Sequence, residues 1–535
     1  MLLTDVIDSQ GKVLDAIKMY ESHPSITSIK KHVKIEKRFD FSPIEIHDIY
    51  SEFKLLDTRK AFPSTNIPPK QLKEVVDIVA EPLQKIWNEE ILTKRTFPSK
   101  LKRADVIPLH KKMETIFEGN YRPVSILVVV SKIFERIMDK QTNSFMENKL
   151  SKFLCGYRKF YSPQHALLVM VERWKESIDK GGFAAGVLMD LSKAFDTINH
   201  ALLIAKLYAY GFSLSSLEII YDYLSDRFQR TKINTSFSSW SALLCGVPQG
   251  SVNGPKYFNI YLNDLFYLFI YTSVCNMADD TTPYACDMDL GNLIRNLEGD
   301  SALAIEWFEA NYMIANGSKC HFLISGPKTL TEHMHIKVDE EIIWESREKE
   351  LLGLIIDKKL HFHSHVKNIC KKASTKVTIL CRLAHIMPFE RKRLLMSAFI
   401  ESQFEKYPLI WIFCTKDLNN KINHIHERAL RIVYLDYTSS FEELLEKDNS
   451  VTIHTRNLRC LAIEMFKVFK GIGPEIVKDL FQFDLNKRSD RTFFRPNVKN
   501  INTGLNTIRY FGTVLWDDML TMELKSIETL EKFKK

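Results

Sequence analysis

Two adjacent acidic residues, Asp279 and Asp280, stand in the middle of the segment CNMADDTT, residues 275–282. Apolar and β-forming residues on both sides predict a strand–turn–strand hairpin that carries the two acids at its tip. Two close carboxylates repel each other unless a cation lies between them, and oxygen ligands of this kind suit Mg²⁺. Because Asp-Asp pairs are also common in solvated turns, the pair by itself leaves a metal site and a plain turn both open.

A third acid, Asp190, follows the apolar run from Ala184 to Met189. The run predicts a buried strand with Asp190 near its end. A carboxylate in that place requires a partner or a metal ion, because burying an unpaired charge is costly. A strand-end acid combined with a distant Asp-Asp hairpin resembles the catalytic sheet of polymerases that use two metal ions.

A third motif, Gly246-Val247-Pro248-Gln249-Gly250-Ser251, lies between the two acidic segments. Together, GVLMDLSKAFDTINH, GVPQGSV and CNMADDTT resemble the reverse transcriptases of non-LTR (LINE-type) retrotransposons of the jockey-like kind. The resemblance extends from about residue 44 to residue 518 and implies an α+β right-hand polymerase fold. We expect an N-terminal extension at 1–87, fingers and a palm with an antiparallel sheet at 88–357, a helical thumb at 358–414 and a helical C-terminal region at 415–535.

The same resemblance implies an RNA-directed DNA polymerase that extends a DNA primer on an RNA template with deoxynucleoside triphosphates. Asp190, Asp279 and Asp280 would be the catalytic residues, and Asp190, Leu191, Asp279 and Asp280 would hold two Mg²⁺ ions, for which Mn²⁺ could substitute. The alternative is a decayed or domesticated remnant that binds nucleic acid without synthesis. Relatives carry an apolar residue in place of Asn253 and usually a glycine in place of Phe160, and both departures favour that alternative.

Cations are expected around the incoming nucleotide because it brings a triphosphate. The segments 101–112 and 120–126 resemble the two fingers strands of the family, with Arg122 as the triphosphate contact and Lys111 or Lys112 beside it. The family also has a lysine near the leaving pyrophosphate at the position of Lys319, where it could act as a general acid. A solvated basic strand and a surface loop are the structural alternatives for these lysines.

The sugar and base of the nucleotide would meet Phe195, Gln249 and Gly250. By resemblance, the aromatic ring of Phe195, five residues past Asp190, lies under the sugar and favours deoxynucleotides. A packing role in the core is compatible with that position. Gln249 and Gly250 are expected to open the next helix, whose free N–H groups could meet an anion or a base edge.

Basic residues are expected to contact the template and primer. Arg158 is a candidate contact of the template phosphates, and Lys371 and Lys372 lie on a predicted helix that would hold the duplex by charge. The segment 350–357 resembles the hairpin that grips the primer. Helices are also predicted at 128–146, 200–210, 216–228, 417–434 and 451–470. Arg227, Arg230 and Lys232 could line the nucleic-acid side.

The composition agrees with a nucleic-acid-binding protein inside the cell. The formal net charge of +8 fits a polyanionic partner without requiring one. The nine cysteines form no CxxC pair, which favours a reduced compartment over a zinc ribbon. The N-terminus lacks the pattern of a signal peptide, and no apolar stretch is long enough to span a bilayer, so we expect no membrane partner. The sequence does not distinguish the nucleus from the cytoplasm as the location of the protein.

Overall fold

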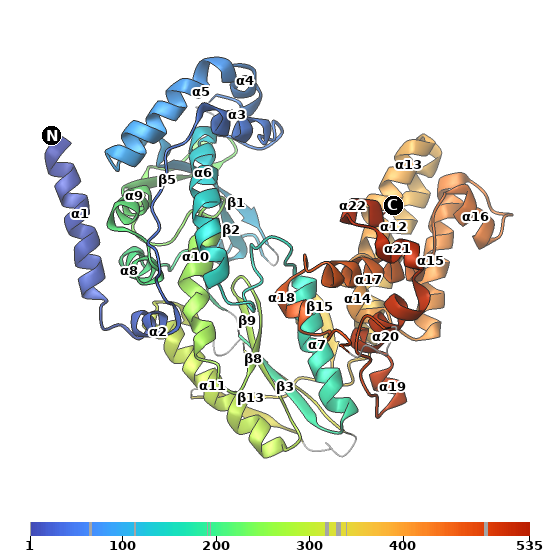
Figure 1. Ribbon diagram of the computed structural model, residues 1–535. Helices are drawn as coiled ribbons and strands as arrows, with labels where there is room; N and C mark the ends of the chain where they lie inside the picture. The colour runs from blue at the N-terminus through green and yellow to red at the C-terminus, as the bar shows by residue number, and fades with distance from the viewer. Residues whose placement is uncertain are drawn as a thin grey trace. The chain divides into compact units, whose positions relative to one another are not determined.

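The computed structural model describes residues 2–63, 67–111, 114–189, 191–192, 194–315, 320–327, 333–338, 340–485 and 491–534 (Figure 1). The chain divides into two compact units. Unit 1 comprises Met1–Tyr157, Leu191–Ile270 and Leu303–Asn316, and unit 2 comprises Arg158–Asp190, Tyr271–Ala302 and Gly317–Lys535. Helices and sheets mix in both units, in agreement with the predicted α+β class.

Unit 1 contains a sheet with the strand order β2-β1-β5-β6, and β7 also pairs with β5. The antiparallel hairpin of β1 and β2 confirms that the segments 101–112 and 120–126 contain paired strands, and β5 joins β1 in parallel. A second, two-stranded sheet joins β4 to β10. The strands are β1 (Arg103–His110), β2 (Tyr121–Leu127), β4 (Leu191–Ser192), β5 (Arg227–Ile233), β6 (Ser236–Phe237), β7 (Ser241–Leu243) and β10 (Ile314–Ala315).

Helix α8 of unit 1 carries clear start and stop signals. The Asn199 side chain accepts a hydrogen bond from the Leu202 N–H (2.9 Å) at the start of α8, and Gly211, with φ of 104°, ends that helix. The helices of unit 1 are α1 (Leu2–Met19), α2 (Pro24–His32), α3 (Ile46–Lys54), α4 (Pro69–Glu74), α5 (Val76–Lys85), α6 (Val129–Met146), α8 (His200–Tyr210), α9 (Leu214–Leu224) and α10 (Gly254–Leu262).

One helix prediction in unit 1 is wrong at its end. The segment 216–228 was expected to be a single helix, but α9 ends at Leu224 and β5 begins at Arg227. Asp226, with φ of 51°, turns the chain between the two elements. The Arg227 side chain is therefore buried, with its Nη1 donating to the Tyr223 carbonyl (2.9 Å), and does not line an exposed nucleic-acid surface.

Unit 2 is built on an antiparallel sheet of four strands in the order β11-β3-β9-β8. Helix α7 packs closely on this sheet, because a Cβ at Gly186 of β3 would lie only 3.1 Å from the Trp174 ring. Two further hairpins join β12 to β13 and β14 to β15. The strands are β3 (Phe183–Leu188), β8 (Ser273–Met277), β9 (Asp280–Asp287), β11 (His321–Ser325), β12 (His335–Val338), β13 (Glu341–Trp344), β14 (Glu348–Leu351) and β15 (Leu354–Asp357).

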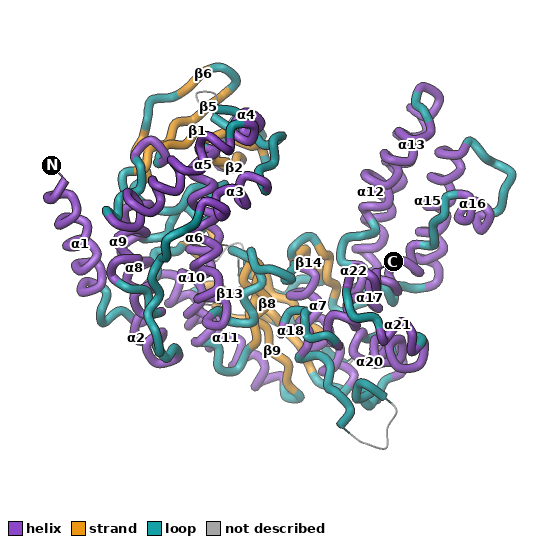
Figure 2. Tube along the Cα trace, turned by 45° about the horizontal axis from the view of Figure 1, so that its top comes forward, coloured by secondary structure: helices purple, strands orange, loops and turns teal. Residues whose placement is uncertain are grey.

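The regular structure described after β15 is helical, as Figure 2 shows. Helices α12 and α15 pack against each other through apolar residues at helical spacing, such as Val377 and Ile425. The helices of unit 2 are α7 (Pro163–Asp179), α12 (His363–Leu383), α13 (Phe389–Leu395), α14 (Pro408–Trp411), α15 (Lys416–Tyr434), α16 (Phe441–Lys447), α17 (Ile453–Phe469), α18 (Glu475–Lys478), α19 (Ile501–Gly504), α20 (Ile508–Val514), α21 (Met522–Ser526) and α22 (Leu530–Lys534).

Helix α11 (Leu290–Ala310) begins in unit 2 and ends in unit 1. Across the described part of the chain, every helix is too short or too polar to cross a bilayer.

Candidate active site

The two adjacent acids lie at the tip of a tight hairpin, as predicted. Strands β8 and β9 pair antiparallel up to Met277 and Asp280, so Ala278 and Asp279 form a two-residue loop. Ala278 has φ of 58°, a conformation that is strained for a residue other than glycine. Asp279 and Asp280 are both half-buried at this turn.

A buried side chain that the sequence analysis missed braces the turn. Asn276, which is 0% exposed, donates from its Nδ2 to the carbonyls of Ala278 (3.1 Å) and Asp280 (3.3 Å). The same Nδ2 lies 3.1 Å from the Thr281 hydroxyl. These bonds hold the loop closed and compensate part of the strain at Ala278.

The end of β3 is joined to this hairpin. The Met189 N–H donates to the Thr281 carbonyl (3.0 Å), and the two residues form an antiparallel bridge. Met189 precedes Asp190 and Thr281 follows Asp280, so residues next to two of the three predicted acids are directly bonded. Asp190 itself lies outside the described residues, as do Lys112 and Lys319.

The acids of the hairpin are suitable metal ligands. Carboxylate oxygens are the hard donors that Mg²⁺ takes, and two adjacent carboxylates on a braced turn fit a divalent cation. Within the described ranges no cluster of three His, Cys, Asp or Glu side chains is found, and Asp190, the third predicted ligand, lies outside those ranges. Leu191, also predicted at the metal site, is buried in β4 of unit 1.

The hairpin of β14 and β15 confirms the hairpin predicted at 350–357. Its turn is bonded to Tyr407, whose hydroxyl donates to the Leu352 carbonyl (2.5 Å). Burial, and then the negative charge of Asp280, raise the pKa of Tyr407. Tyr407 therefore lies within electrostatic reach of the acidic hairpin, a relation that nothing in the sequence indicated.

The GVPQG segment belongs to unit 1 and contacts two other predicted elements there. A Cβ at Gly246 would lie 2.7 Å from the Phe195 carbonyl, and the Val247 N–H donates to that carbonyl (3.0 Å). On the other side, the Gln249 carbonyl accepts from the Ser125 N–H of β2 (2.7 Å). Gly250, at φ of 130°, approaches Ser125 so closely that a Cβ would lie 2.5 Å from its carbonyl oxygen.

This contact brings together the predicted nucleotide-binding residues of unit 1. Arg122 is exposed on β2, three residues before Ser125. Lys111 is exposed directly after β1, and its N–H donates to the Asn120 carbonyl (2.8 Å). Phe195 is half-buried and stacks on Phe258, with ring centroids 4.7 Å apart. The expectation that Gln249 and Gly250 open a helix is wrong, because α10 begins only at Gly254.

Two further residues position the GVPQG segment. Glu135 is fully buried and accepts from the Val252 N–H (2.6 Å), and burial raises the pKa of its carboxyl group. His200 lies with its Nε2 2.7 Å from the Gly246 carbonyl oxygen. Asn253, the departure from the family pattern, is buried, with its Nδ2 3.6 Å from the Met138 sulfur. These contacts join distant segments, so no local sequence signal could have revealed them.

The predicted template and primer contacts are surface cations of unit 2. Arg158 is half-buried, and its guanidinium lies 4.3 Å from the Tyr161 ring centroid. Phe160, at the position where the resemblance led us to expect glycine, adopts φ of 69°, the region that glycine favours. Lys371 and Lys372 are exposed on α12.

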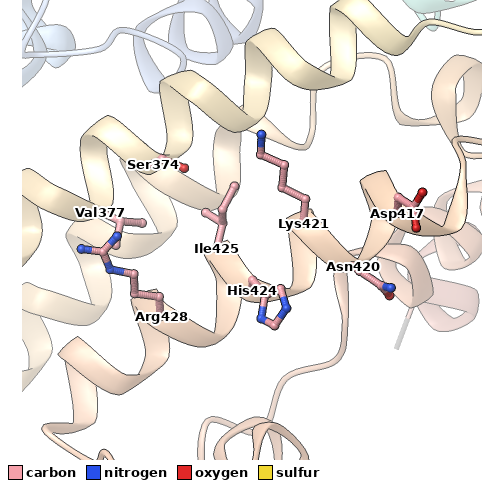
Figure 3. Close-up of a pocket in the computed structure, with 8 residues that line it drawn as sticks. All are labelled: Ser374, Val377, Asp417, Asn420, Lys421, His424, Ile425 and Arg428. Carbon is pink, nitrogen blue, oxygen red and sulfur yellow. The ribbon is translucent and has the colours of Figure 1, made fainter.

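A groove between α12 and α15, with a volume of about 370 Å³, adds to the basic surface of α12. Figure 3 shows the Lys421 and Arg428 side chains extending from α15 towards α12. The hydroxyl-bearing Ser374 of α12 and His424 of α15 also line the groove, while Asp417 at one end is its acidic residue. Cations and neutral hydrogen-bonding groups along one groove suit a chain of phosphates.

Comparison with known proteins identifies the class of this site. Residues 109–356 match the family model of reverse transcriptase (RNA-dependent DNA polymerase), so this segment is a reverse transcriptase domain. Enzymes of this family generally use divalent metal ions.

Two fruit-fly relatives narrow the class. The probable RNA-directed DNA polymerase from transposon BS of Drosophila melanogaster is 25% identical over 418 residues, which cover 75% of this chain and 45% of the relative. The RNA-directed DNA polymerase from mobile element jockey of the same species is 25% identical over 341 residues, 57% of this chain and 37% of the relative. The chain thus spans less than half the length of these relatives. Over these ranges the chain is similar to polymerases of mobile elements, which supports the resemblance of its motifs to non-LTR retrotransposon reverse transcriptases.

Proposed function

We propose that this chain is an RNA-directed DNA polymerase that extends a DNA primer on an RNA template. The observation that carries the proposal is the hydrogen bond between Met189 and Thr281. It joins the strand that leads to Asp190 to the hairpin that presents Asp279 and Asp280. Three carboxylates gathered in this way would form the metal site of a nucleotidyl transferase.

In this proposal Asp190, Asp279 and Asp280 hold two Mg²⁺ ions, with the Leu191 backbone beside them. The bound ions would lower the barrier to attack by the primer 3′-hydroxyl and stabilise the charge on the leaving pyrophosphate. The contribution of the protein is mainly positioning. Asn276 keeps the turn closed so that both carboxylates stay in one orientation.

The nucleotide would be bound by the residues that converge in unit 1. The Arg122 guanidinium offers a planar fork to phosphate oxygens, and Lys111 adds a point charge. Phe195, whose ring is backed by Phe258, would present its free edge to the sugar. Gln249 and Gly250 would approach the base pair through their backbone, because glycine at 250 leaves no side chain in the way.

The finer architecture of a right hand follows from the same proposal. Residues 88–357 would form fingers and palm, residues 358–414 the thumb, and residues 1–87 and 415–535 flanking extensions. Arg158, Lys371 and Lys372 would hold template and primer phosphates, and the groove of Lys421 and Arg428 extends this basic surface.

Primer extension on an RNA template tests the proposal. We expect the parent protein to extend a DNA primer with Mg²⁺ or Mn²⁺, and the Asp279→Asn variant to lose this activity by about a thousandfold or more, because a metal ligand loses its charge. Template binding and the melting temperature should stay unchanged, since Asp279 lies in a loop that Asn can also occupy.

A matched control is Asp287→Asn, which removes the same charge from the other end of β9 and should retain activity. Near-parent synthesis by Asp279→Asn would exclude the assigned metal site. A parent protein that binds template and primer yet synthesises nothing would support the alternative of a decayed remnant, to which the buried Asn253 and the positive φ of Phe160 point.

A further inference from the structure

Among the buried lysines of the described residues, Lys206 and Lys175 differ in how their charge is compensated. Lys206 in unit 1 is 0% exposed, and its Nζ donates to Asp264 Oδ1 (2.7 Å) and the Tyr261 carbonyl (2.6 Å). Lys175 on α7 of unit 2 is 6% exposed, and its Nζ donates to the Asn506 carbonyl (2.9 Å). Among the described residues no carboxylate forms an ion pair with Lys175. A buried charge without a partner is costly, so Lys175 requires an explanation.

The neighbours of Lys175 compensate its charge only in part. Glu172, one helical turn earlier, is engaged elsewhere, because its carboxylate accepts from the Arg509 N–H (3.0 Å). The rings of Phe362 and Phe413 have centroids 5.9 and 5.4 Å from the Nζ, which gives weak cation–π attraction. Burial accordingly lowers the pKa of Lys175, and the charge of Glu172 opposes this shift without cancelling it.

Lys175 lines a cavity of about 260 Å³ within unit 2. The residues that line it come from α7, the connection between β15 and α12, α14 with the residues that follow it, and the chain around α19. Figure 1 labels these helices. Lys359, His361 and His363 add basic groups, and none of the described residues that line the cavity is acidic. Phe362, Trp411 and Phe413 supply flat apolar walls. The cavity is therefore electropositive on one part of its surface and aromatic on another.

The wall that carries the additional basic groups is held in one conformation. The Asp357 carboxylate accepts from the N–H groups of Lys359 (3.0 Å), His361 (3.3 Å) and Phe362 (2.6 Å). Helix α12 then begins at His363 without a side-chain cap, and it is 21 residues long. Uncapped N–H groups and the helix dipole favour an anion at this end.

We propose that this cavity binds a phosphate group on Lys175, carried by a single nucleotide whose base or sugar lies against the aromatic walls. A cavity slightly below the usual size of ligand pockets, roughly 300–1,000 Å³, accommodates one nucleotide and excludes a duplex. A phosphate has several acceptor oxygens, which can meet the two remaining Lys175 protons and the basic groups of the β15–α12 connection. The phosphate belongs either to a free nucleotide or to the end of a strand.

Binding without metal tests this site apart from polymerisation. With EDTA present, we expect AMP to raise the melting temperature of the parent protein in a saturable manner, by mass action on the folded state. Adenosine should give no such shift. The Lys175→Met variant should fold at least as stably as the parent, because it removes an unpaired buried charge, and it should bind AMP about tenfold or more weakly by calorimetry.

The matched control is Lys180→Met, which removes the same charge from an exposed lysine just after α7 and should bind AMP like the parent. A dinucleotide with a 5′-phosphate, compared with its unphosphorylated form, tells a strand end from a free nucleotide. Equal AMP affinity in the parent and in Lys175→Met would overturn the proposal, and so would an equal response to adenosine and AMP.

Discussion

Phe195 illustrates how one side chain can serve both packing and selectivity. One face of its ring is stacked on Phe258 with an interplanar angle of 15°, and Tyr157 meets it edge-on at 6.0 Å. The ring is nevertheless half-buried rather than enclosed. The core interpretation and the sugar-contact interpretation are thus compatible in this geometry, and a substitution distinguishes them by its effect on substrate choice.

Replacing Phe195 with valine should admit ribonucleotides. A 2′-hydroxyl pressed on the ring loses hydrogen bonds to water, at a cost of about 1–3 kcal/mol, so the ring should discriminate roughly tenfold or more. We expect the ratio of kcat/KM for a deoxynucleotide to that for its ribonucleotide to fall by this factor in Phe195→Val. Phe195→Tyr keeps the ring and should keep the ratio; if the ratio is unchanged in Phe195→Val, the residue acts only in packing.

At the scale of elements, charge has two different roles in the helical part of unit 2. Lys371 and Lys372 of α12 are exposed, so their charges are available to bind phosphates. Glu401, by contrast, lies buried between helices and is paired with Arg456 (2.9 Å) and Arg393 (3.3 Å), while Arg393 also bonds Asp448 (2.7 Å). Burial by itself would raise the pKa of Glu401, but His426 and the two arginines outweigh it and hold that pKa well below its ordinary value.

Neutralising the two lysines of α12 should reduce the salt dependence of template–primer binding. Each phosphate contact contributes about 0.9 to the slope of log affinity against log salt for a duplex. We therefore expect the slope of the Lys371→Gln/Lys372→Gln double variant to be lower by roughly two. The control pair is Lys30→Gln/Lys31→Gln, two adjacent exposed lysines on α2. A slope equal to that of the parent would show that α12 does not face the duplex.

The Glu401 network should make stability depend on acid pH. Because its pKa is lowered in the folded state, the carboxylate stabilises the protein above the unfolded pKa of about 4.3, and this stabilisation is lost as the pH falls below that value. At pH 7, Glu401→Gln should lower the free energy of unfolding by about 3 kcal/mol. The difference between variant and parent should shrink in denaturant titrations below about pH 4. The control is Glu390→Gln, at an exposed position, which should change the stability little at any pH. If the loss of stability in Glu401→Gln were the same at every pH, the ion pairs of Glu401 would not be its cause.

At the scale of the whole molecule, the elements that could be predicted are the helices and hairpins set by residue patterns within one segment of the chain. Helices at 128–146, 200–210, 417–434 and 451–470 appear within a few residues of their predicted ends, and the acidic hairpin and the strands of the β1–β2 pair are present. What could not be predicted depends on contacts between distant segments. Glu135 binds the segment after GVPQG across more than a hundred residues, and Arg227 is buried because β5 starts where a helix was expected.

The two-residue loop of the acidic hairpin has a consequence for how this gene tolerates change. Side chains alternate between the faces of a strand, so one added codon between those for Met277 and Asp280 would either flip Asp280 to the opposite face or force a bulge. It would also move the Ala278 carbonyl away from the Asn276 amide that now holds it. An insertion of three bases that keeps the reading frame would thus be as damaging here as the loss of an aspartate.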